Sequence, residues 1–233
     1  MLAILFRNLL GSYLILFMSI CSFAQQLEQR GDDLKAFASW FDSQMTGLSP
    51  IYYGESYPLI MRARFGHQFY DSRQWKNGTI LIDDQYYFDL PLLFDIEDQQ
   101  LVLRNPDPTL QAAVKLDMNR LAQFTLDSTR FIRLQSGKRN VFYEVIVDGF
   151  SLDLLATNTK ELQLKSDGYY YEYSKKYFLY YDHRLIPLRT KAALKELPKD
   201  IYTATKNVKG ARLKLRKEES LIVYFKELDE IIQ

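Results

Sequence analysis

The sequence predicts an α+β fold, mainly an antiparallel β-sheet arranged as a sandwich or an open barrel, with a C-terminal helical segment packed on it. Two observations support this prediction. Short apolar segments joined by hairpin-length links follow one another from about residue 57 to residue 188, with no helical segment between them. Near Thr190 the spacing of apolar residues changes from two to about three and a half, which is close to the period of a helix.

The first 24 residues have the pattern of a cleavable secretory signal peptide. Arg7 is the only charged side chain before Glu28, and an apolar stretch follows it. Ser22-Phe23-Ala24 then places small residues three positions and one position before a cleavage point. We therefore expect export, with cleavage after Ala24 and a periplasmic or outer-envelope location.

Two alternatives to cleavage after Ala24 remain open. An uncleaved membrane anchor would need about 20 predominantly apolar residues, whereas Gly11, Ser12 and Ser19 interrupt this stretch. A lipoprotein acylated at Cys21 would usually have a small residue where Ile20 stands. No second membrane-spanning segment is expected in the rest of the chain.

Cleavage would also decide which chemistry remains. Cys21 is the only cysteine, so the processed chain would have no disulfide, thiol nucleophile or thiolate metal site. A content of 47% hydrophobic and 15% aromatic residues is typical of a globular protein. The net charge of +1 becomes zero when Arg7 is lost, which gives no reason to expect a nucleic-acid partner.

The chain is expected to contain one globular unit after the signal peptide. Residues 25–50 are predicted to be an N-terminal helix or linker, because apolar residues within 27–45 recur at spacings of three and four. Residues 51–188 form the predicted antiparallel β domain. Residues 189–233 form the predicted C-terminal helices, which belong to the same unit.

Polar pairs and short turn sequences mark the expected hairpins. Asn77-Gly78 and Asp83-Asp84 are predicted turns on either side of a strand. Pro91 lies inside an apolar run and indicates an edge strand or a bulge. The expected strands are 79–82, 86–88, 90–96, 101–103, 130–134, 141–147, 152–156, 162–164, 169–173, 177–181 and 184–188.

Three helices are expected after the strands. Thr190 can cap a short helix through Leu197, and Pro198 fits the first turn of a second helix that Gly210 ends. The clearest helix covers about 216–232, and its apolar residues repeat at spacings of three and four. They are Leu221, Tyr224, Phe225, Leu228, Ile231 and Ile232.

Several segments together resemble a group of uncharacterised exported proteins common in Bacteroidetes. They are residues 51–57, 66–70, 90–96 and 177–181, together with the terminal helices and the Ala24-Gln25-Gln26 junction. The resemblance spans most of the processed chain and rests on loose patterns. It implies export and a continuous fold, and it implies no activity and no functional residue.

The two histidines are candidates for a general base or a ligand. His183 follows Asp182 in a predicted two-residue hairpin turn, which favours a turn role. His67 follows Gly66 in a loop rich in aromatic residues, and a hydrogen-bonded structural role is favoured over catalysis. Two distant histidines without cysteine do not predict a zinc site.

Carboxylates are the remaining catalytic option. A glycoside hydrolase needs two of them across a cleft, but most of the clustered acidic residues occupy positions where hairpin turns favour polar side chains. Asp95 differs because it interrupts an apolar run, so we expect it to be buried and paired, for example with an arginine. The acidic residues are Asp83, Asp84, Asp89, Asp95, Glu97 and Asp98.

Tyrosines are concentrated on the last predicted strands. Alternation places some rings on each face, so one face would be core and the other could stack on a sugar or contact a partner. Core packing and strand propensity are the favoured explanation. The tyrosines are Tyr169, Tyr170, Tyr171, Tyr173, Tyr177, Tyr180 and Tyr181.

Residues 189–217 contain ten basic residues and only two acidic ones, Glu196 and Asp200. The simpler interpretation is a solvated helical face, partly neutralised by the acidic residues that follow. The alternative is contact with anionic lipid head groups or a polyanionic envelope polymer.

Two function classes follow from these patterns. The favoured class is a non-enzymatic envelope protein that binds a partner protein or an envelope ligand. The alternative is a carboxylate-dependent hydrolase that acts on envelope material or glycans. The chain has no G-x-S-x-G, P-loop or G-x-G-x-x-G sequence, so no catalytic, cofactor-binding or metal-binding residue is predicted. Whether Asp95 or His67 lines a cleft would separate the two classes.

Overall fold

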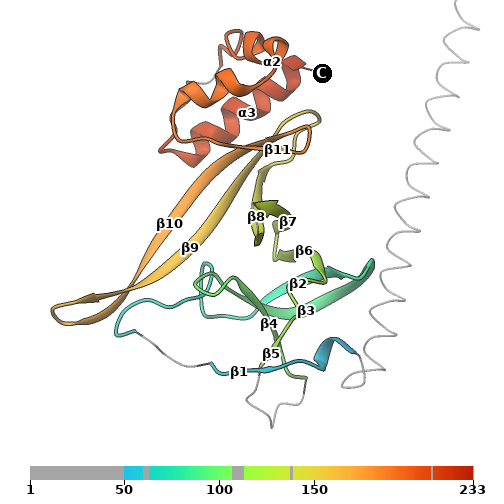
Figure 1. The fold of residues 1–233 in the computed structure, drawn as a ribbon, viewed down its shortest axis with the longest axis vertical. Helices are drawn as coiled ribbons and strands as arrows, with labels where there is room; N and C mark the ends of the chain where they lie inside the picture. The colour runs from blue at the N-terminus through green and yellow to red at the C-terminus, as the bar shows by residue number, and fades with distance from the viewer. Residues whose placement is uncertain (1–49, 60–62, 107–112, 137–138, 211, 233) are drawn as a thin grey trace, which may run out of the picture. The chain divides into compact units, whose positions relative to one another are not determined.

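One antiparallel sheet of 11 strands dominates the part of the chain that the structure describes (Figure 1). This computed structural model describes residues 50–59, 63–106, 113–136, 139–210 and 212–232. The predicted signal peptide at 1–24 and the predicted helix within 27–45 lie outside these residues. The predicted fold class, a mainly antiparallel sheet with a C-terminal helical segment packed on it, is confirmed.

The sheet is open, with β1 and β11 at its edges. Its strand order is β1-β5-β4-β3-β2-β6-β7-β8-β9-β10-β11. Most neighbours are therefore consecutive hairpin strands, while β1 pairs with β5 and β6 pairs with β2. The strands are β1 (Ser56–Tyr57), β2 (Lys76–Ile82), β3 (Gln85–Asp95), β4 (Gln100–Arg104), β5 (Ala113–Lys115), β6 (Leu121–Leu126), β7 (Thr129–Ser136), β8 (Arg139–Val147), β9 (Asp153–Lys165), β10 (Gly168–Tyr181) and β11 (Arg184–Pro187).

Two predicted hairpin turns are present in the structure. Asp83 and Asp84, between β2 and β3, have φ angles of 47° and 61°. Asp182 and His183, between β10 and β11, have φ angles of 44° and 59°. Positive φ at both central residues is the geometry of a type I′ turn, whose twist matches that of the flanking strands. The predicted turn role of His183 is confirmed.

Asn77-Gly78 does not form the predicted turn and instead lies inside β2. Glycine is required there because neighbouring strands approach closely. A Cβ on Gly78 would lie 2.2 Å from the Thr125 carbonyl oxygen and 2.7 Å from a methyl carbon of Leu92. The dipeptide resembles a turn locally, but the packing of β2 between β3 and β6 decides its conformation.

Pro91 lies next to a bulge, as one of its two interpretations predicts. The register between β2 and β3 shifts between Gly78 and Ile80, and Asp89 opposite has a φ angle of 54°. The edge-strand interpretation is wrong, because β3 pairs with β2 on one side and β4 on the other. Pairing with β4 begins only at Leu92, one residue after the proline.

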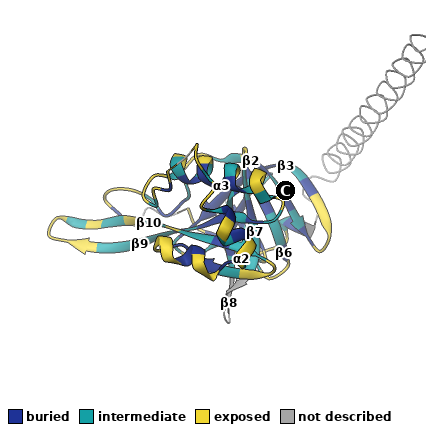
Figure 2. Ribbon diagram, turned by 90° about the horizontal axis from the view of Figure 1, so that it is seen from above, coloured by how far each residue is buried: buried dark blue, intermediate teal, exposed yellow. Residues whose placement is uncertain are grey.

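Strands β9 and β10 are longer than predicted. The sequence predicts breaks at 157–161 and 174–176, but the two strands pair without interruption along this region. The hairpin that they form extends well away from the helices (Figures 1 and 2). Strands β5 and β6 are not among the predicted strands. Polar residues are common at 157–161 and 174–176, and pairing between β9 and β10 rather than an apolar pattern keeps these residues extended.

The helical elements follow the sheet, apart from the short η1 (Pro50–Tyr52). They are η2 (Lys191–Glu196), α2 (Lys199–Ala204) and α3 (Glu218–Ile232). The prediction that Gly210 ends the second helix is wrong, because α2 ends at Ala204. The Glu227 carboxylate accepts hydrogen bonds from the backbone N–H groups of Lys209 and Gly210, which fixes that segment as a loop.

Two large apolar cores are arranged along the sheet. The first core is formed by β2, β3, β4, β6, β7 and β8, and Phe94, Phe124 and Phe131 stack or meet edge to face within it. The second core joins β8 to β11 with η2, α2 and α3. The side of α3 that faces the sheet is buried (Figure 2). Leu221, Tyr224, Phe225 and Leu228 are its buried residues.

Candidate functional site

Asp95 is buried, as predicted, but its partners differ from the prediction. It ends β3 and is 0% exposed. One carboxylate oxygen accepts the Tyr57 hydroxyl at 2.5 Å, and the other accepts the backbone N–H groups of Glu97 and Asp98 at 2.9 and 3.0 Å. Burial raises the pKa of Asp95, and these hydrogen bonds oppose the rise. No arginine among the described residues pairs with it, and its hydrogen bonds join β1 to the turn after β3.

His67 lies close to Lys160 of β9 rather than in a catalytic pair. The Lys160 ammonium is 3.5 Å from His67 Nδ1 and donates to the Phe69 carbonyl at 2.5 Å. Burial lowers the pKa of His67, and the charges of Lys160 and Arg73 lower it further. Burial also lowers the pKa of Lys160. His67 is therefore neutral at pH 7. Among the described residues, the cavity that Lys160 lines is formed by Tyr70, Asp71 and Tyr173, and His67 is not part of that lining.

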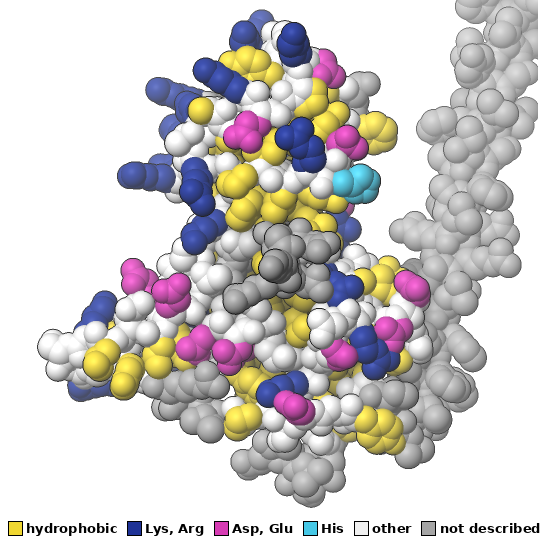
Figure 3. Space-filling view, viewed as in Figure 1, with side chains coloured by type: hydrophobic (Ala, Val, Ile, Leu, Met, Phe, Trp, Pro, Cys, Tyr) yellow, Lys and Arg dark blue, Asp and Glu magenta, His cyan; other side chains and the backbone are white. Residues whose placement is uncertain are grey.

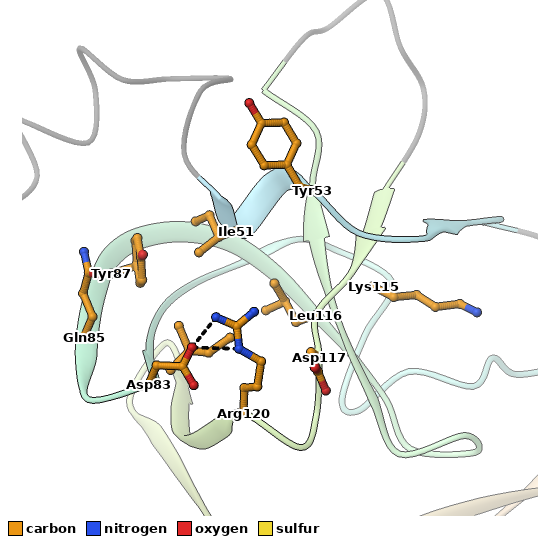
Figure 4. A pocket seen from close by; sticks show the side chains of 10 residues that line it. Ile51, Tyr53, Asp83, Gln85, Tyr87, Lys115, Leu116, Asp117 and Arg120 are labelled. Atoms are coloured by element: carbon orange, nitrogen blue, oxygen red, sulfur yellow. Dashed lines mark hydrogen bonds and ion pairs between the residues drawn. The ribbon is translucent and has the colours of Figure 1, made fainter.

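The predicted acidic cluster does not form one site. Asp83 lines a cavity of about 200 Å³ together with Asp117 and Arg120 (Figure 4). Arg120 Nε donates to Asp83 at 2.7 Å, and this hydrogen bond lowers the pKa of the carboxyl group. Asp89 lies at the bulge in β3, and Glu97 and Asp98 form the turn that Asp95 caps.

A polar cluster that is buried at Glu144 and Asn158 separates the two apolar cores, and we call it the polar seam. Glu144 of β8 accepts from the Asn158 side chain at 2.7 Å and pairs with Lys175 of β10 at 3.0 Å. Lys175 also pairs with Glu218, in the first turn of α3, at 2.5 Å. The other members are Tyr70, which bonds to Glu144, Tyr173, which donates to Asn158, and Tyr177, which donates to Glu218.

The seam holds Lys175 in its charged form. Burial lowers the pKa of this lysine, but the hydrogen bonds and charges of Glu218 and Glu144 outweigh that effect and raise it. Burial and Glu218 also raise the pKa of Tyr177. The seam is thus a set of ionised and neutral groups in a fixed arrangement, and it links the sheet to the start of α3.

The seven predicted tyrosines have different environments, and none is fully buried. Tyr177 and Tyr181 pack against the helical core, as the core interpretation predicts. Tyr170 stacks on Phe65 with ring centroids 5.2 Å apart. Tyr169 and Tyr173 are 48% and 51% exposed, so their rings remain available to solvent.

The basic residues of 189–217 form an exposed surface, which we call the basic cap. All ten side chains are exposed, and none makes an ion pair with a carboxylate among the described residues. Lys and Arg side chains accordingly gather over the helical part (Figure 3). They are Arg189, Lys191, Lys195, Lys199, Lys206, Lys209, Arg212, Lys214, Arg216 and Lys217.

Three of the acidic residues that follow the basic cap make hydrogen bonds or ion pairs with groups other than its ten basic side chains. Glu218 bonds to Lys175 and Tyr177 in the polar seam. Glu227 accepts from the backbone of Lys209 and Gly210. Asp229 accepts from the backbone N–H groups of the loop at 150–151. None of these three carboxylates forms an ion pair with the ten basic side chains of the cap among the described residues.

The sequence analysis did not predict the polar seam or the cavity at Lys160. Their members are spread over β8, β9, β10 and α3, and single charged residues on half-polar strands give no local signal. Predicting them would have required the register between β9 and β10, which places Lys175 opposite Asn158 and Tyr173 opposite Lys160.

Within the described residues, no group of three or more His, Cys, Asp and Glu side chains could hold a metal ion. The helices among these residues are too short or too polar to cross a membrane. Comparison of the chain with protein-family models, curated proteins and solved structures found no match.

Proposed function

We propose that this chain is an exported, non-enzymatic protein of the cell envelope that docks on an anionic membrane surface through its basic cap. The observation that supports the proposal is the exposure of ten cationic side chains, none of which forms an ion pair with a carboxylate among the described residues. The signal-peptide pattern and the resemblance to exported proteins common in Bacteroidetes support the envelope location.

Charge is strongly segregated along the chain. Ten basic and two acidic residues give 189–217 a net charge of +8, while the whole chain carries +1, so the remainder carries −7. An anionic leaflet attracts each nearby Lys or Arg by about 1 kcal/mol. Several cap residues acting together would therefore orient the protein, because the same surface repels the acidic remainder.

The described carboxyl groups favour binding over the hydrolase alternative. A general acid must remain protonated while it faces substrate. Asp95 has a raised pKa, but it is fully buried and its oxygens are occupied. Asp83 does line a cavity, but Arg120 lowers its pKa and keeps it ionised.

Vesicle flotation tests the proposal. The protein is purified after export, with Gln25 as its expected first residue, and mixed with phosphatidylglycerol-containing or phosphatidylcholine vesicles. We expect binding to the anionic vesicles only, with loss at high salt because the surface attraction is screened. The double variant Lys209→Gln and Lys214→Gln should weaken binding about 30-fold, since each lysine contributes about 1 kcal/mol.

The matched control is the double variant Lys165→Gln and Lys176→Gln, which removes two exposed lysines from the β9–β10 hairpin. This variant should bind like the wild type. Equal binding to both kinds of vesicle, or an unchanged affinity of the cap variant, would overturn the proposal. Salt-sensitive retention on an immobilised anionic polysaccharide without vesicle binding would also overturn it and would point to a polymer instead.

A further inference from the structure

A second cavity lies beside the polar seam, outside the basic cap. It has a volume of about 300 Å³, and its lining among the described residues is Tyr70, Asp71, Lys160 and Tyr173. Lys160 and Tyr173 are direct cross-strand partners on β9 and β10, so their side chains share one face of the hairpin. Tyr70 and Asp71 belong to the loop that precedes β2.

Lys160 is a partly buried cation without a carboxylate partner at ion-pair distance among the described residues. Its ammonium donates to the Phe69 carbonyl and touches His67, so it retains capacity for a further acceptor. The two nearest acidic residues are engaged elsewhere. Asp71 pairs with Lys76 at 3.1 Å, and Asp95 accepts from Tyr57. An anion that enters the cavity would complete the coordination of Lys160.

The rest of the lining indicates what kind of anion would fit. A volume of 300 Å³ is at the lower end of the range for small-molecule pockets. Tyr173 is 51% exposed and belongs to the lining, and an aromatic ring of this kind can pack against the C–H groups of a ligand. The exposed Asp71 carboxylate can accept hydrogen bonds from hydroxyl groups.

We propose that this cavity binds a small hydroxylated carboxylic acid of monosaccharide size, such as a sugar acid. The ligand carboxylate pairs with Lys160, the sugar ring packs on Tyr173, and a hydroxyl group donates to Asp71. The site is independent of the basic cap, so either proposal can fail without the other.

Isothermal titration with D-glucuronate tests this site, and D-glucose is the uncharged control ligand. We expect glucuronate to bind with a dissociation constant on the order of 1 mM and glucose to bind much more weakly. Lys160→Met should weaken glucuronate binding about 10-fold to 100-fold, because a hydrogen bond to a charged group is lost. Lys176→Met, which removes an exposed lysine from the opposite face of β10, should leave the affinity unchanged.

Amide chemical shifts of the wild-type protein give a second readout that does not depend on the folding of the Lys160 variant. Glucuronate should shift the resonances of Asp71, Lys160 and Tyr173 and leave that of Lys209 in the basic cap unchanged. Absence of binding, equal binding of glucose, or shifts confined to the basic cap would each overturn the proposal. An unchanged affinity of a folded Lys160→Met variant would do the same.

Discussion

Asp95 shows how one buried carboxylate organises its surroundings. Its two oxygens accept three hydrogen bonds, from Tyr57 at the sheet edge and from the backbone of Glu97 and Asp98. Gln68 donates in turn to the Tyr57 hydroxyl at 3.3 Å. A buried acceptor that satisfies several donors is structurally important even when ionisation there is unfavourable.

Substitution of Asp95 separates hydrogen bonding from charge. Asp95→Ala leaves buried donors without a partner and should cost about 1–3 kcal/mol for each such donor. Asp95→Asn keeps an oxygen for the two backbone N–H groups but presents an N–H₂ group to the Tyr57 hydroxyl, so at neutral pH it should cost about 1–3 kcal/mol, less than Asp95→Ala. Urea unfolding of both variants measures these differences in free energy.

The same variants test the direction of the pKa shift. Because burial raises the pKa of Asp95 in the folded state, its contribution to stability is full below the unfolded value of 3.8 and decreases as pH rises through the raised pKa. Asp95→Asn lacks this contribution, so its stability relative to the wild type should increase as pH rises from about 4 toward neutrality. A pH-independent difference between the two proteins would contradict the assignment.

At the scale of single elements, α3 is the helix whose buried face the sequence predicts most closely. The predicted stripe is buried at Leu221, Tyr224, Phe225 and Leu228, while Ile231 at the end of the helix is 40% exposed. The opposite face carries exposed residues such as Lys226. The helix therefore completes the second core through one face, and its stripe is not a free docking surface.

Truncation of Phe225 should be costly. Phe225 is 1% exposed, and the loss of a buried aromatic ring typically costs about 3–5 kcal/mol. Against a domain stability of about 5–15 kcal/mol, Phe225→Ala should lower the thermal midpoint markedly. Lys226→Ala is the matched control, and its effect should stay within about 0.5 kcal/mol. Thermal unfolding followed by circular dichroism measures both, and an unchanged midpoint for Phe225→Ala would refute the packing role.

At the scale of the whole described unit, the polar seam lies between two apolar cores along one face of the sheet. Glu144 is the direct partner of Phe131, which belongs to the first core, and Glu218 begins the helix of the second core. Lys175 connects these two carboxylates. Because the seam is satisfied internally, it fixes the position of α3 relative to the sheet more specifically than apolar contacts would.

Replacement of Lys175, the cation at the centre of the polar seam, tests whether the seam fixes the position of α3. Lys175→Met leaves Glu144 without its charged partner in a buried setting and should cost about 3–5 kcal/mol. Lys176→Met, an exposed neighbour on the other face of β10, should cost less than about 0.5 kcal/mol. Adding Glu144→Gln to Lys175→Met should restore part of the lost stability, because the double variant has no unpaired carboxylate at position 144. Equal urea midpoints for the two single variants would show that the seam does not couple the cores.

The amino-acid sequence by itself determined the features that local stereochemistry fixes. Asp83-Asp84 and Asp182-His183 form the predicted turns because polar residues there tolerate positive φ. The α3 stripe is buried because its helical period leaves one apolar face. The mainly antiparallel sheet follows from short strands joined by tight links.

The tertiary structure alone decided which distant residues meet. Asn77-Gly78 lies in a strand because β3 and β6 pack around it, and β9 and β10 remain unbroken because each supplies the other's hydrogen bonds. Likewise, Glu218 faces Lys175 across the seam instead of neutralising the basic cap beside it in sequence. Such pairings depend on register between segments far apart in the chain, and local propensity and spacing contain no information about that register.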